Sequence, residues 1–320
     1  MRTVFITTLF IISLISITNC QNLKNGNYVE KIGDLKLNYS IKGNCSEVML
    51  IGHPNSGKIG YELSLQPLED SFKIIYYDPR GTGKSEAPTH IKGYNQDSLV
   101  QEIDNLRKKL GVKKIWLFAH SDQSAIALIY ALKFPQYTKG LIITGTSLIG
   151  TQAETYERRK HSEAIRSKES EWFAQVIKDW DYMFTNKVKI NKDGQDISNS
   201  PLKWWCYNEE TAQKVISIAN EISKVGRRKQ VAGKSYKETS NEREKYLSYQ
   251  LRFKEITAPI LIVNGIYDTN NPPDYVKKLH EVLPTSNLIL IDNSGHFPWI
   301  ENREVTFNAI NTWLSEYKRL

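Results

Sequence analysis

The chain is poor in cysteine and has no long apolar run after its first twenty residues. Three cysteines among 320 residues are too few for a disulfide framework, and their spacing matches no Cys/His metal site. We therefore expect no metal centre. Cys45 and Cys206 lie far apart in the sequence, so either they pair in an oxidising compartment or both stay free. No later stretch approaches the roughly 20 apolar residues of a membrane-spanning helix, which excludes a protein with several such helices.

An excess of acidic charge is also missing. The 43 Lys and Arg residues outnumber the 35 Asp and Glu residues, and the net charge is +8. The basic residues are spread along the chain instead of forming one block. That distribution is typical of a soluble surface and not of a nucleic-acid footprint, so we expect no nucleic-acid partner.

Residues 1–20 have the composition of an export signal. A positively charged start precedes an uncharged apolar run over 4–17 that is too short to span a membrane. The next residues resemble the end of a bacterial lipoprotein signal with Cys20 as the lipidated residue, although Asn19 stands where glycine or alanine is usual. The alternative is ordinary cleavage near Cys20. We expect a secreted protein or a lipoprotein of the bacterial cell envelope, in contact with a membrane only through that lipid.

From residue 27 onward, strand-like and helical segments alternate. The pattern predicts a β-hairpin over 27–42 with a turn at Gly33. Further strands are predicted at 47–51, 72–77, 114–119, 140–144, 260–264 and 288–292, and helices at 98–110, 124–134, 274–283 and 305–317. These strands are uniformly apolar, which indicates a mostly parallel sheet covered by helices on both faces, an α/β fold.

The alternation breaks between residues 148 and 254, where the chain becomes polar and helix-prone. We interpret 148–254 as a helical cap insertion seated on the carboxyl ends of the strands. It divides the α/β core into a first part, 27–147, and a second part, 255–320.

The most informative motif follows the predicted strand 114–119. Ser121 stands at a direct strand-to-helix turn with a small residue, Ala119, two positions before it. A nucleophilic serine on such a turn needs small neighbours, because the strand and helix backbones approach closely there. The alternative is that Ser121 or Asp122 only caps the helix.

Two further residues follow later strands. Asp268 comes after the strand 260–264, and His296 lies in a glycine-containing loop after 288–292. An acid can hold an imidazole in one tautomer, and the imidazole can act as a base near neutral pH. Taken singly, a turn aspartate and a surface histidine are equally good interpretations.

Together, these segments resemble the α/β hydrolases. Residues 119–124 resemble the Gly-His-Ser-X-Gly-Gly nucleophile turn of that family, and the order serine, aspartate, histidine is the family's order. The resemblance implies an α/β-hydrolase fold with Ser121 as nucleophile, His296 as base and Asp268 as orienting acid. Gln123 departs from the family, since glycine is usual at that position.

The segment 53–57, His-Pro-Asn-Ser-Gly, resembles the family's His-Gly-X-Pro-Gly loop. That resemblance implies an oxyanion hole formed by the backbone N–H groups of Asn55 and Asp122. The segment 78–85, Asp-Pro-Arg-Gly-Thr-Gly-Lys-Ser, ends like a phosphate-binding loop but lacks its first glycine and is followed by Pro88 where a helix should begin. For these two reasons we reject nucleotide binding. The segment resembles a structural turn of proline iminopeptidase-like α/β hydrolases.

The resemblance implies a serine hydrolase that needs no cofactor and cleaves an ester or amide bond through an acyl-enzyme. Its substrate is a small ester or amide or a short peptide. Proline iminopeptidase activity and carboxylesterase activity are equally compatible, because the serine turn and the oxyanion loop both differ from those of the peptidases. Trp204, Trp205 and Trp299 are candidate walls of the substrate pocket. The alternative is that the cap aromatics form the cap's own core.

Two other functions stay open at this point. A bulky Gln123 would suit a non-catalytic binding protein that keeps the fold. Haloalkane dehalogenases and epoxide hydrolases share the fold and use an aspartate nucleophile, for which Asp122 is the candidate. Residue-by-residue matching favours Ser121, because the bulky His120 stands two positions before Asp122.

Overall fold

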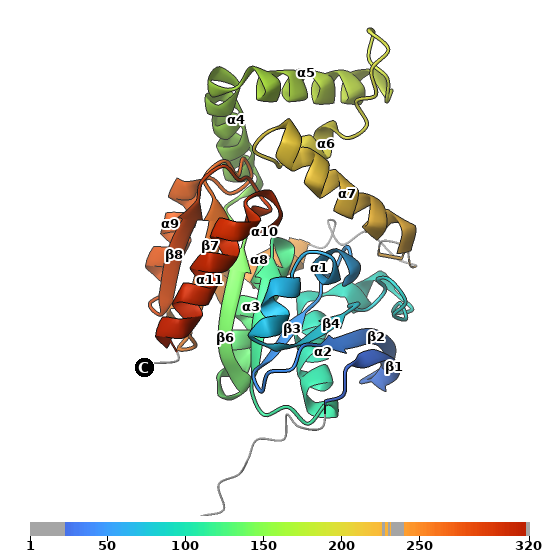
Figure 1. Ribbon diagram of the computed structural model, residues 1–320, viewed down its shortest axis with the longest axis vertical. Coiled ribbons are helices and arrows are strands. Elements are labelled where there is room, and N and C mark those ends of the chain that lie inside the picture. Colours follow the sequence, from blue (N-terminus) through green and yellow to red (C-terminus); the bar gives the residue numbers. More distant parts are fainter. Residues whose placement is uncertain (1–22, 226–227, 230, 232–239, 318–320) are drawn as a thin grey trace, which may run out of the picture.

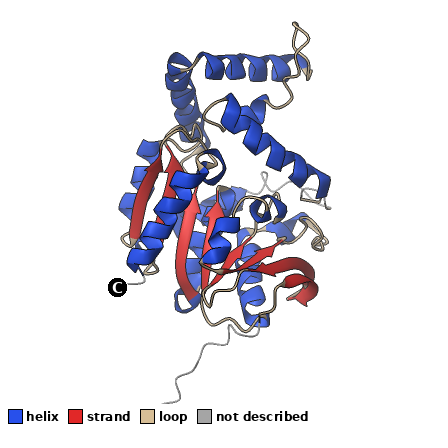
Figure 2. Cartoon of the chain, viewed as in Figure 1, coloured by secondary structure: helices blue, strands red, loops and turns tan. Residues whose placement is uncertain are grey.

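The computed structural model describes residues 23–225, 228–229, 231 and 240–317. The predicted export signal 1–20, with Cys20, lies outside the described residues. One eight-stranded sheet with the strand order β1-β2-β4-β3-β5-β6-β7-β8 forms the centre of the molecule. Figure 2 shows this sheet with helices on both sides.

The N-terminal edge of the sheet is antiparallel. β1 (Gly26–Ile32) pairs with β2 (Leu35–Lys42) through a turn at Gly33, whose φ of 64° lies in the left-handed region that glycine adopts readily. β2 also pairs antiparallel with β4 (Lys73–Tyr77). The hairpin predicted over 27–42 is therefore present.

The other strand pairs are parallel. The strands involved besides β4 are β3 (Val48–Ile51), β5 (Ile115–His120), β6 (Thr138–Thr144), β7 (Ile260–Gly265) and β8 (Ser286–Ile291). From β3 to β7 nearly every strand residue is buried. Burial on both faces explains why the sequence shows continuous apolar runs in place of alternation.

Helices complete two apolar cores, one on each face of the sheet. On one face pack α2 (Gln96–Lys109), α3 (Asp122–Lys133) and α9 (Pro273–Val282). On the other face pack α1 (Ile59–Glu62), α10 (Pro298–Glu301) and α11 (Arg303–Tyr317). Short 3-10 turns occur at Gln66–Asp70, Ile91–Tyr94, Pro135–Tyr137 and Phe253–Glu255. The predicted fold class, a mostly parallel sheet flanked by helices, is confirmed.

The helices of the insertion fall into two groups. α4 (Gln152–Glu169), α5 (Glu171–Asn186), α6 (Ser200–Lys203) and α7 (Glu209–Val225) stand beyond the carboxyl ends of the central strands (Figure 1). α8 (Ser240–Gln250) instead returns to the sheet, where Tyr246 joins the main core. We call α4 to α7 the cap.

Both cysteines in the described part of the chain are free. The Cys45 thiol donates to the Asp70 carbonyl, and Cys206 is buried in the cap. The sequence left open whether Cys45 and Cys206 form a disulfide or stay free, and the structure shows two free thiols. None of the described helices combines the length and the apolar character needed to cross a bilayer.

Candidate active site

Ser121 occupies a strained turn between β5 and α3. β5 ends at His120 and α3 begins at Asp122, so a single residue changes the chain direction, with φ 54° and ψ −124°. A residue with a Cβ adopts positive φ at a cost, and such geometry persists only where the surroundings enforce it. Here the Ser121 N–H donates to the Thr144 carbonyl at 3.0 Å, and its carbonyl accepts the Ser124 N–H at 2.9 Å. The half-buried side chain is thereby held at the carboxyl end of the central strand.

Gly145 makes room for two histidines beside this turn. It follows β6 with φ 60°, and a Cβ placed on it would lie 2.9 Å from both His120 Cδ2 and His296 Cε1. Real Cβ atoms do not approach ring atoms so closely, so any side chain at position 145 would displace the rings. The glycine thus sets how close His296 comes to the end of β5.

Gln123, the departure from the expected glycine, is 4% exposed, and its side chain lies near the Tyr77 phenol on β4. The larger side chain is therefore accommodated in the interior beside a polar group. Ser124, the next residue, is fully buried and small. The strand-to-helix turn forms at Ser121 despite the substitution.

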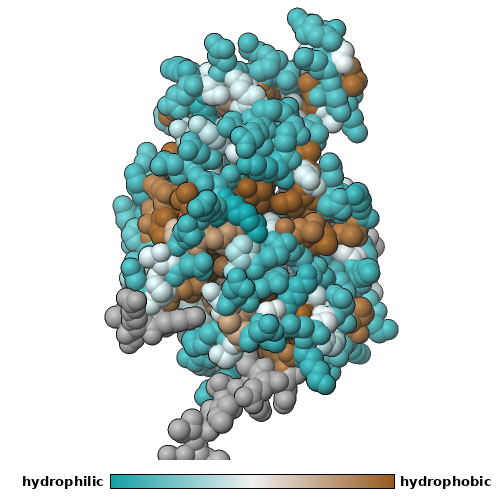
Figure 3. Space-filling model, viewed as in Figure 1, coloured by the Kyte–Doolittle hydropathy of each residue, from teal (hydrophilic) through white to brown (hydrophobic). Residues whose placement is uncertain are grey.

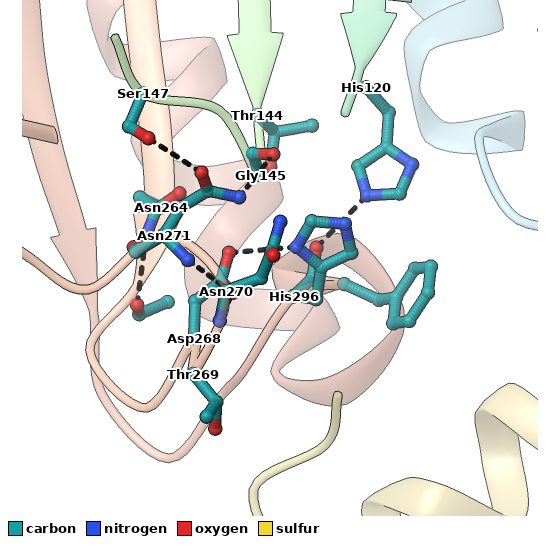
Figure 4. A network of polar contacts seen from close by, with 12 residues as sticks. His120, Thr144, Gly145, Ser147, Asn264, Asp268, Thr269, Asn270, Asn271 and His296 are labelled. Atoms are coloured by element: carbon teal, nitrogen blue, oxygen red, sulfur yellow. Dashed lines mark hydrogen bonds and ion pairs between the residues drawn. The ribbon is translucent and has the colours of Figure 1, made fainter. Parts of the chain in front are cut away.

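Asp268 and His296 form a buried pair (Figure 4). His296 Nδ1 donates to Asp268 Oδ2 at 2.8 Å, while Asp268 Oδ1 accepts the N–H groups of Asn270 at 2.9 Å and Asn271 at 3.0 Å. Burial alone would raise the pKa of Asp268, but His296 and these backbone donors lower it below its ordinary value. The carboxylate is thus ionised near neutral pH and holds the imidazole with its proton on Nδ1, which leaves Nε2 as the basic nitrogen.

His296 Nε2 has no hydrogen-bond partner among the described residues, although it is buried. The ring lies 4.6 Å, between centroids, from the ring of His120, which directly precedes Ser121. Within the described part of the chain the Ser121 hydroxyl forms no hydrogen bond to this nitrogen. The structure therefore brings Asp268 and His296 into contact and places His296 beside the serine turn with its basic nitrogen unused.

His120 and His53 lie behind this site in neutral form. His120 Nε2 donates to the His296 carbonyl at 3.2 Å, and its Nδ1 faces the Tyr61 hydroxyl at 3.4 Å. Burial and the neighbouring histidines lower the pKa of His120 well below its usual range. Burial also lowers the pKa of His53 to about 4. Both rings therefore act as hydrogen-bonding supports, and His120 holds the loop of His296.

Asn55 and Asp122 lie side by side. The Asn55 side-chain amide donates to Asp122 Oδ2 at 3.1 Å, which joins the loop after β3 to the start of α3. The Asp122 N–H belongs to the first turn of α3 and has no acceptor within the helix. The Asn55 N–H instead donates to His53 Nδ1 at 3.2 Å. The Asn55 carbonyl accepts the Arg228 N–H at 3.3 Å, so the insertion also touches this loop.

A family model described as alpha/beta hydrolase fold matches residues 48–303. The chain belongs to this family of hydrolases. It is similar to the proline iminopeptidase of Clostridium botulinum, with 25% identity over 297 residues that cover 88% of this chain and 96% of that protein. It is also similar to the proline iminopeptidase of Saccharolobus solfataricus, with 26% identity over 294 residues and 87% coverage of each.

Solved structures agree with this fold. A hydrolase of Bacillus anthracis superimposes with a TM-score of 0.65 at 16% identity and covers 90% of this chain and 99% of its own. VinJ superimposes with a TM-score of 0.66 at 17% identity, with 91% and 98% coverage. These likenesses show the α/β-hydrolase fold and confirm the predicted architecture.

The three candidate tryptophans of this hydrolase lie in different places. Trp205 packs on His296 with ring centroids 4.1 Å apart, and its carbonyl accepts the His296 N–H at 2.8 Å. Trp204 is buried in the cap's own core and donates to Glu163. Trp299 is buried in the core on one face of the sheet, where it packs on β5, and donates to Ser64. Only Trp205 therefore faces the candidate active site directly.

The segment 78–85 is a structural turn in this hydrolase. Asp78 accepts the N–H groups of Lys58 and Lys84 and the side-chain amide of Asn38, so one carboxylate ties three loops together. Arg80 pairs with the buried Glu102 of α2 at 2.9 Å. A phosphate-binding loop leads directly into a helix. In the described part of the chain no helix directly follows this segment.

Sequence reasoning missed Gly145 and Asn271. Gly145 carried one signal, a glycine directly after a predicted strand. Asn271 donates its N–H to Asp268 and its side-chain amide to the Gly145 carbonyl at 2.8 Å, which joins the acid loop to the strand beside it. An asparagine in a turn is common, and this role became visible only in the folded chain.

Proposed function

We propose that this α/β hydrolase is a serine hydrolase that cleaves an ester or amide bond through an acyl-enzyme, with Ser121 as nucleophile, His296 as base and Asp268 as orienting acid. The observation that carries the proposal is the buried Asp268–His296 hydrogen bond of 2.8 Å, with His296 Nε2 unpaired beside a serine held at φ 54°. A buried acid–imidazole pair and a strained serine at a strand-to-helix turn are two of the elements that activate a hydroxyl nucleophile.

In the first step, rotation of the Ser121 side chain brings its hydroxyl to His296 Nε2, which takes the proton as the oxygen attacks the substrate carbonyl. The tetrahedral intermediate collapses, and the imidazolium protonates the departing alcohol or amine. Water then attacks the acyl-enzyme while His296 accepts its proton, and the acid is released. Asp268 stays ionised throughout and stabilises the imidazolium.

The developing oxyanion needs two donors. The Asp122 N–H is free of helix acceptors and supports the proposed role directly. To serve as the second donor, the Asn55 N–H must leave His53 Nδ1 and turn toward the substrate. This change is feasible because the hydrogen bond to the neutral imidazole is long, at 3.2 Å. Substrate entry and the movement of this loop are therefore coupled in the proposed mechanism.

Two substrate classes fit the proposal, namely small esters and short peptides with an N-terminal proline. The curated relatives named proline iminopeptidase favour the peptide. A panel of p-nitrophenyl esters assayed beside proline β-naphthylamide separates the two classes. Hydrolysis of neither class, with intact fluorophosphonate labelling, would point to another acyl group.

A fluorophosphonate probe tests the nucleophile. We expect labelling of the intact protein, loss of labelling in Ser121→Ala, and unchanged labelling in Ser223→Ala, a control at an exposed serine of α7. Labelling that survives Ser121→Ala would overturn the assignment. No labelling of the intact protein would favour the non-catalytic binding protein.

The aspartate nucleophile has less support. Asp122 is exposed, takes the first helical position of α3 and accepts a hydrogen bond from Asn55, while the strained position belongs to Ser121. Trapping of a covalent ester on Asp122 with an epoxide or haloalkane would favour it.

We also propose that residues 1–20 direct export and that Cys20 carries the lipid. The sequence of this segment is the support. Growth with radiolabelled palmitate should label the wild type and not Cys20→Ala, and an unlabelled wild type would contradict the lipid step.

A further inference from the structure

Cap helix α4 contacts each of the three residues that follow Asp268. Arg166 Nη1 donates to Thr269 Oγ1 at 2.6 Å, and Arg159 Nε donates to Asn270 Oδ1 at 2.8 Å. The third contact runs through Ser147, which accepts from Arg158 Nη1 at 2.9 Å and donates to Asn271 Oδ1 at 2.7 Å. Figure 4 shows Ser147, Asn271 and Asp268 in one network. The loop that carries the candidate acid is thus held from the cap.

Two of these arginines are buried without an ion pair. Arg158 is 7% exposed and Arg166 is 6% exposed, and neither contacts a carboxylate within the described part of the chain. Arg166 also donates to the carbonyls of Cys206 and Tyr207, at 2.8 and 3.1 Å. Arg158 Nε is buried and has no hydrogen-bond partner among the described residues.

Uncompensated burial of a cation is unfavourable, so the charge of each arginine must be balanced at longer range. Asp268 attracts both side chains, and Glu301 also attracts Arg166. Burial lowers the pKa of Arg166 to about 10, which still leaves it charged at neutral pH. The backbone N–H groups and His296 already hold the Asp268 carboxylate in place, so the two cations add charge without competing for its oxygens.

We propose that Arg158 and Arg166 are positioning residues of the triad, which hold the loop after Asp268 from the cap and bring two positive charges to the loop that carries its carboxylate. This inference rests on the proposed function, since it assigns the arginines a role through Asp268 and His296. The base is then fully organised only while α4 is seated on the core. Displacement of the cap would remove the loop contacts and the two charges together.

The charged groups around the Asp268–His296 pair determine in which direction the pH profile of activity moves when an arginine is removed. Asp268 is anionic, and Glu301 and Asp122 are the nearby acids, while His53 and His120 are neutral through burial. Arg158 and Arg166 are the buried cations of this network, and the exposed Arg159 on Asn270 is a third cation on the same loop. Removing one of the buried cations stabilises the imidazolium, so the acidic limb of the activity profile should move to higher pH.

The test is the pH dependence of fluorophosphonate inactivation and of p-nitrophenyl ester hydrolysis by the full chain. Arg158→Gln and Arg166→Gln should raise the apparent pKa of the acidic limb by roughly one pH unit, the size expected for losing a charge in a partly screened interior. Arg166→Lys keeps the charge but loses the forked contacts, so its limb should stay in place while kcat falls. Lys168→Gln removes an exposed charge from the same helix and should change neither.

The outcomes separate the two proposals. A reactive wild type whose acidic limb does not move in either glutamine variant would overturn the positioning role and leave the serine mechanism intact. A wild type with neither labelling nor hydrolysis would overturn the mechanism. NMR titration of 15N-labelled histidines would then still read the His296 pKa, and an unchanged value in Arg158→Gln would reject the inference. If Arg166→Gln fails to fold, Arg158→Gln and Arg166→Lys decide the question.

Discussion

The Asp268 carboxylate and the His296 imidazole, 28 positions apart in the chain, share a 2.8 Å hydrogen bond with both side chains almost fully buried. The bond links the loop after β7 to the loop after β8, two adjacent parallel strands. Because Nδ1 makes this bond, the other ring nitrogen, Nε2, is left without a hydrogen-bond partner among the described residues. The orientation of the base therefore depends on the charge of one carboxylate.

Replacing Asp268 by asparagine should lower kcat for ester hydrolysis by about 10³- to 10⁴-fold, because the amide can stabilise the wrong tautomer and no longer stabilises the imidazolium. The side chain keeps its size, so circular dichroism and the thermal midpoint should change little. Steady-state kinetics with a p-nitrophenyl ester checks this. An activity within tenfold of wild type would show that another group orients His296.

Gly145→Ala should impair activity and stability together. Its Cβ would meet His120 and His296 at 2.9 Å, and φ 60° is unfavourable for alanine. We expect about 1–3 kcal/mol loss in the free energy of unfolding and a lower kcat, because His296 must shift. The matched control is Gly111→Ala, where φ is 67° but nothing lies within 4 Å of the added Cβ. Urea denaturation should show about 1 kcal/mol there, with kcat unchanged.

Trp205→Ala should open the space above His296 while keeping the backbone contact to its N–H. We expect kcat/KM for long-chain p-nitrophenyl esters to rise relative to the acetate. Trp204→Ala, one residue earlier but inside the cap core, should instead lower stability by about 3–5 kcal/mol. Equal changes in ester preference for both variants would show that Trp205 has no special position.

Asp97 should contribute acid-sensitive stability. It joins α2 to Lys133 of α3 and to Lys245 and Tyr249 of α8. Burial opposes its ionisation, but hydrogen bonds from these three residues lower its pKa to about 2, against 3.8 as the usual value.

A lowered folded-state pKa stabilises the protein above pH 3.8, and this contribution is lost as the pH falls toward 2. Asp97→Asn should therefore cost about 1 kcal/mol near pH 6, after screening at this partly exposed site, and progressively less below pH 4. Guanidinium unfolding at several pH values measures the difference. Asp193→Asn, in an exposed cap loop, is the control and should show no such pH dependence.

The order of strands and helices could be predicted from the sequence because burial on both faces demands continuous apolar segments. The helix expected over 98–110 is found at Gln96–Lys109, and the strand expected over 114–119 at Ile115–His120. Small residues around Ser121 and the order of Ser121, Asp268 and His296 likewise pointed to one edge of the sheet. These features are local, or depend only on the fact that parallel strands end at a common edge.

Other features depended on side chains that meet only after folding. The sequence does not show that Trp205 packs on His296 while Trp204 is buried in the cap core, because adjacent aromatic residues in a chain give no sign of which one will contact a distant loop. Nor does it show that Arg158 and Arg166 approach the acid loop, more than 100 positions away along the chain. Patterning along the chain determined which segments are buried and where the sheet ends. The tertiary structure decided which polar groups share a site, since hydrogen bonds form between atoms that packing, and not sequence proximity, brings together.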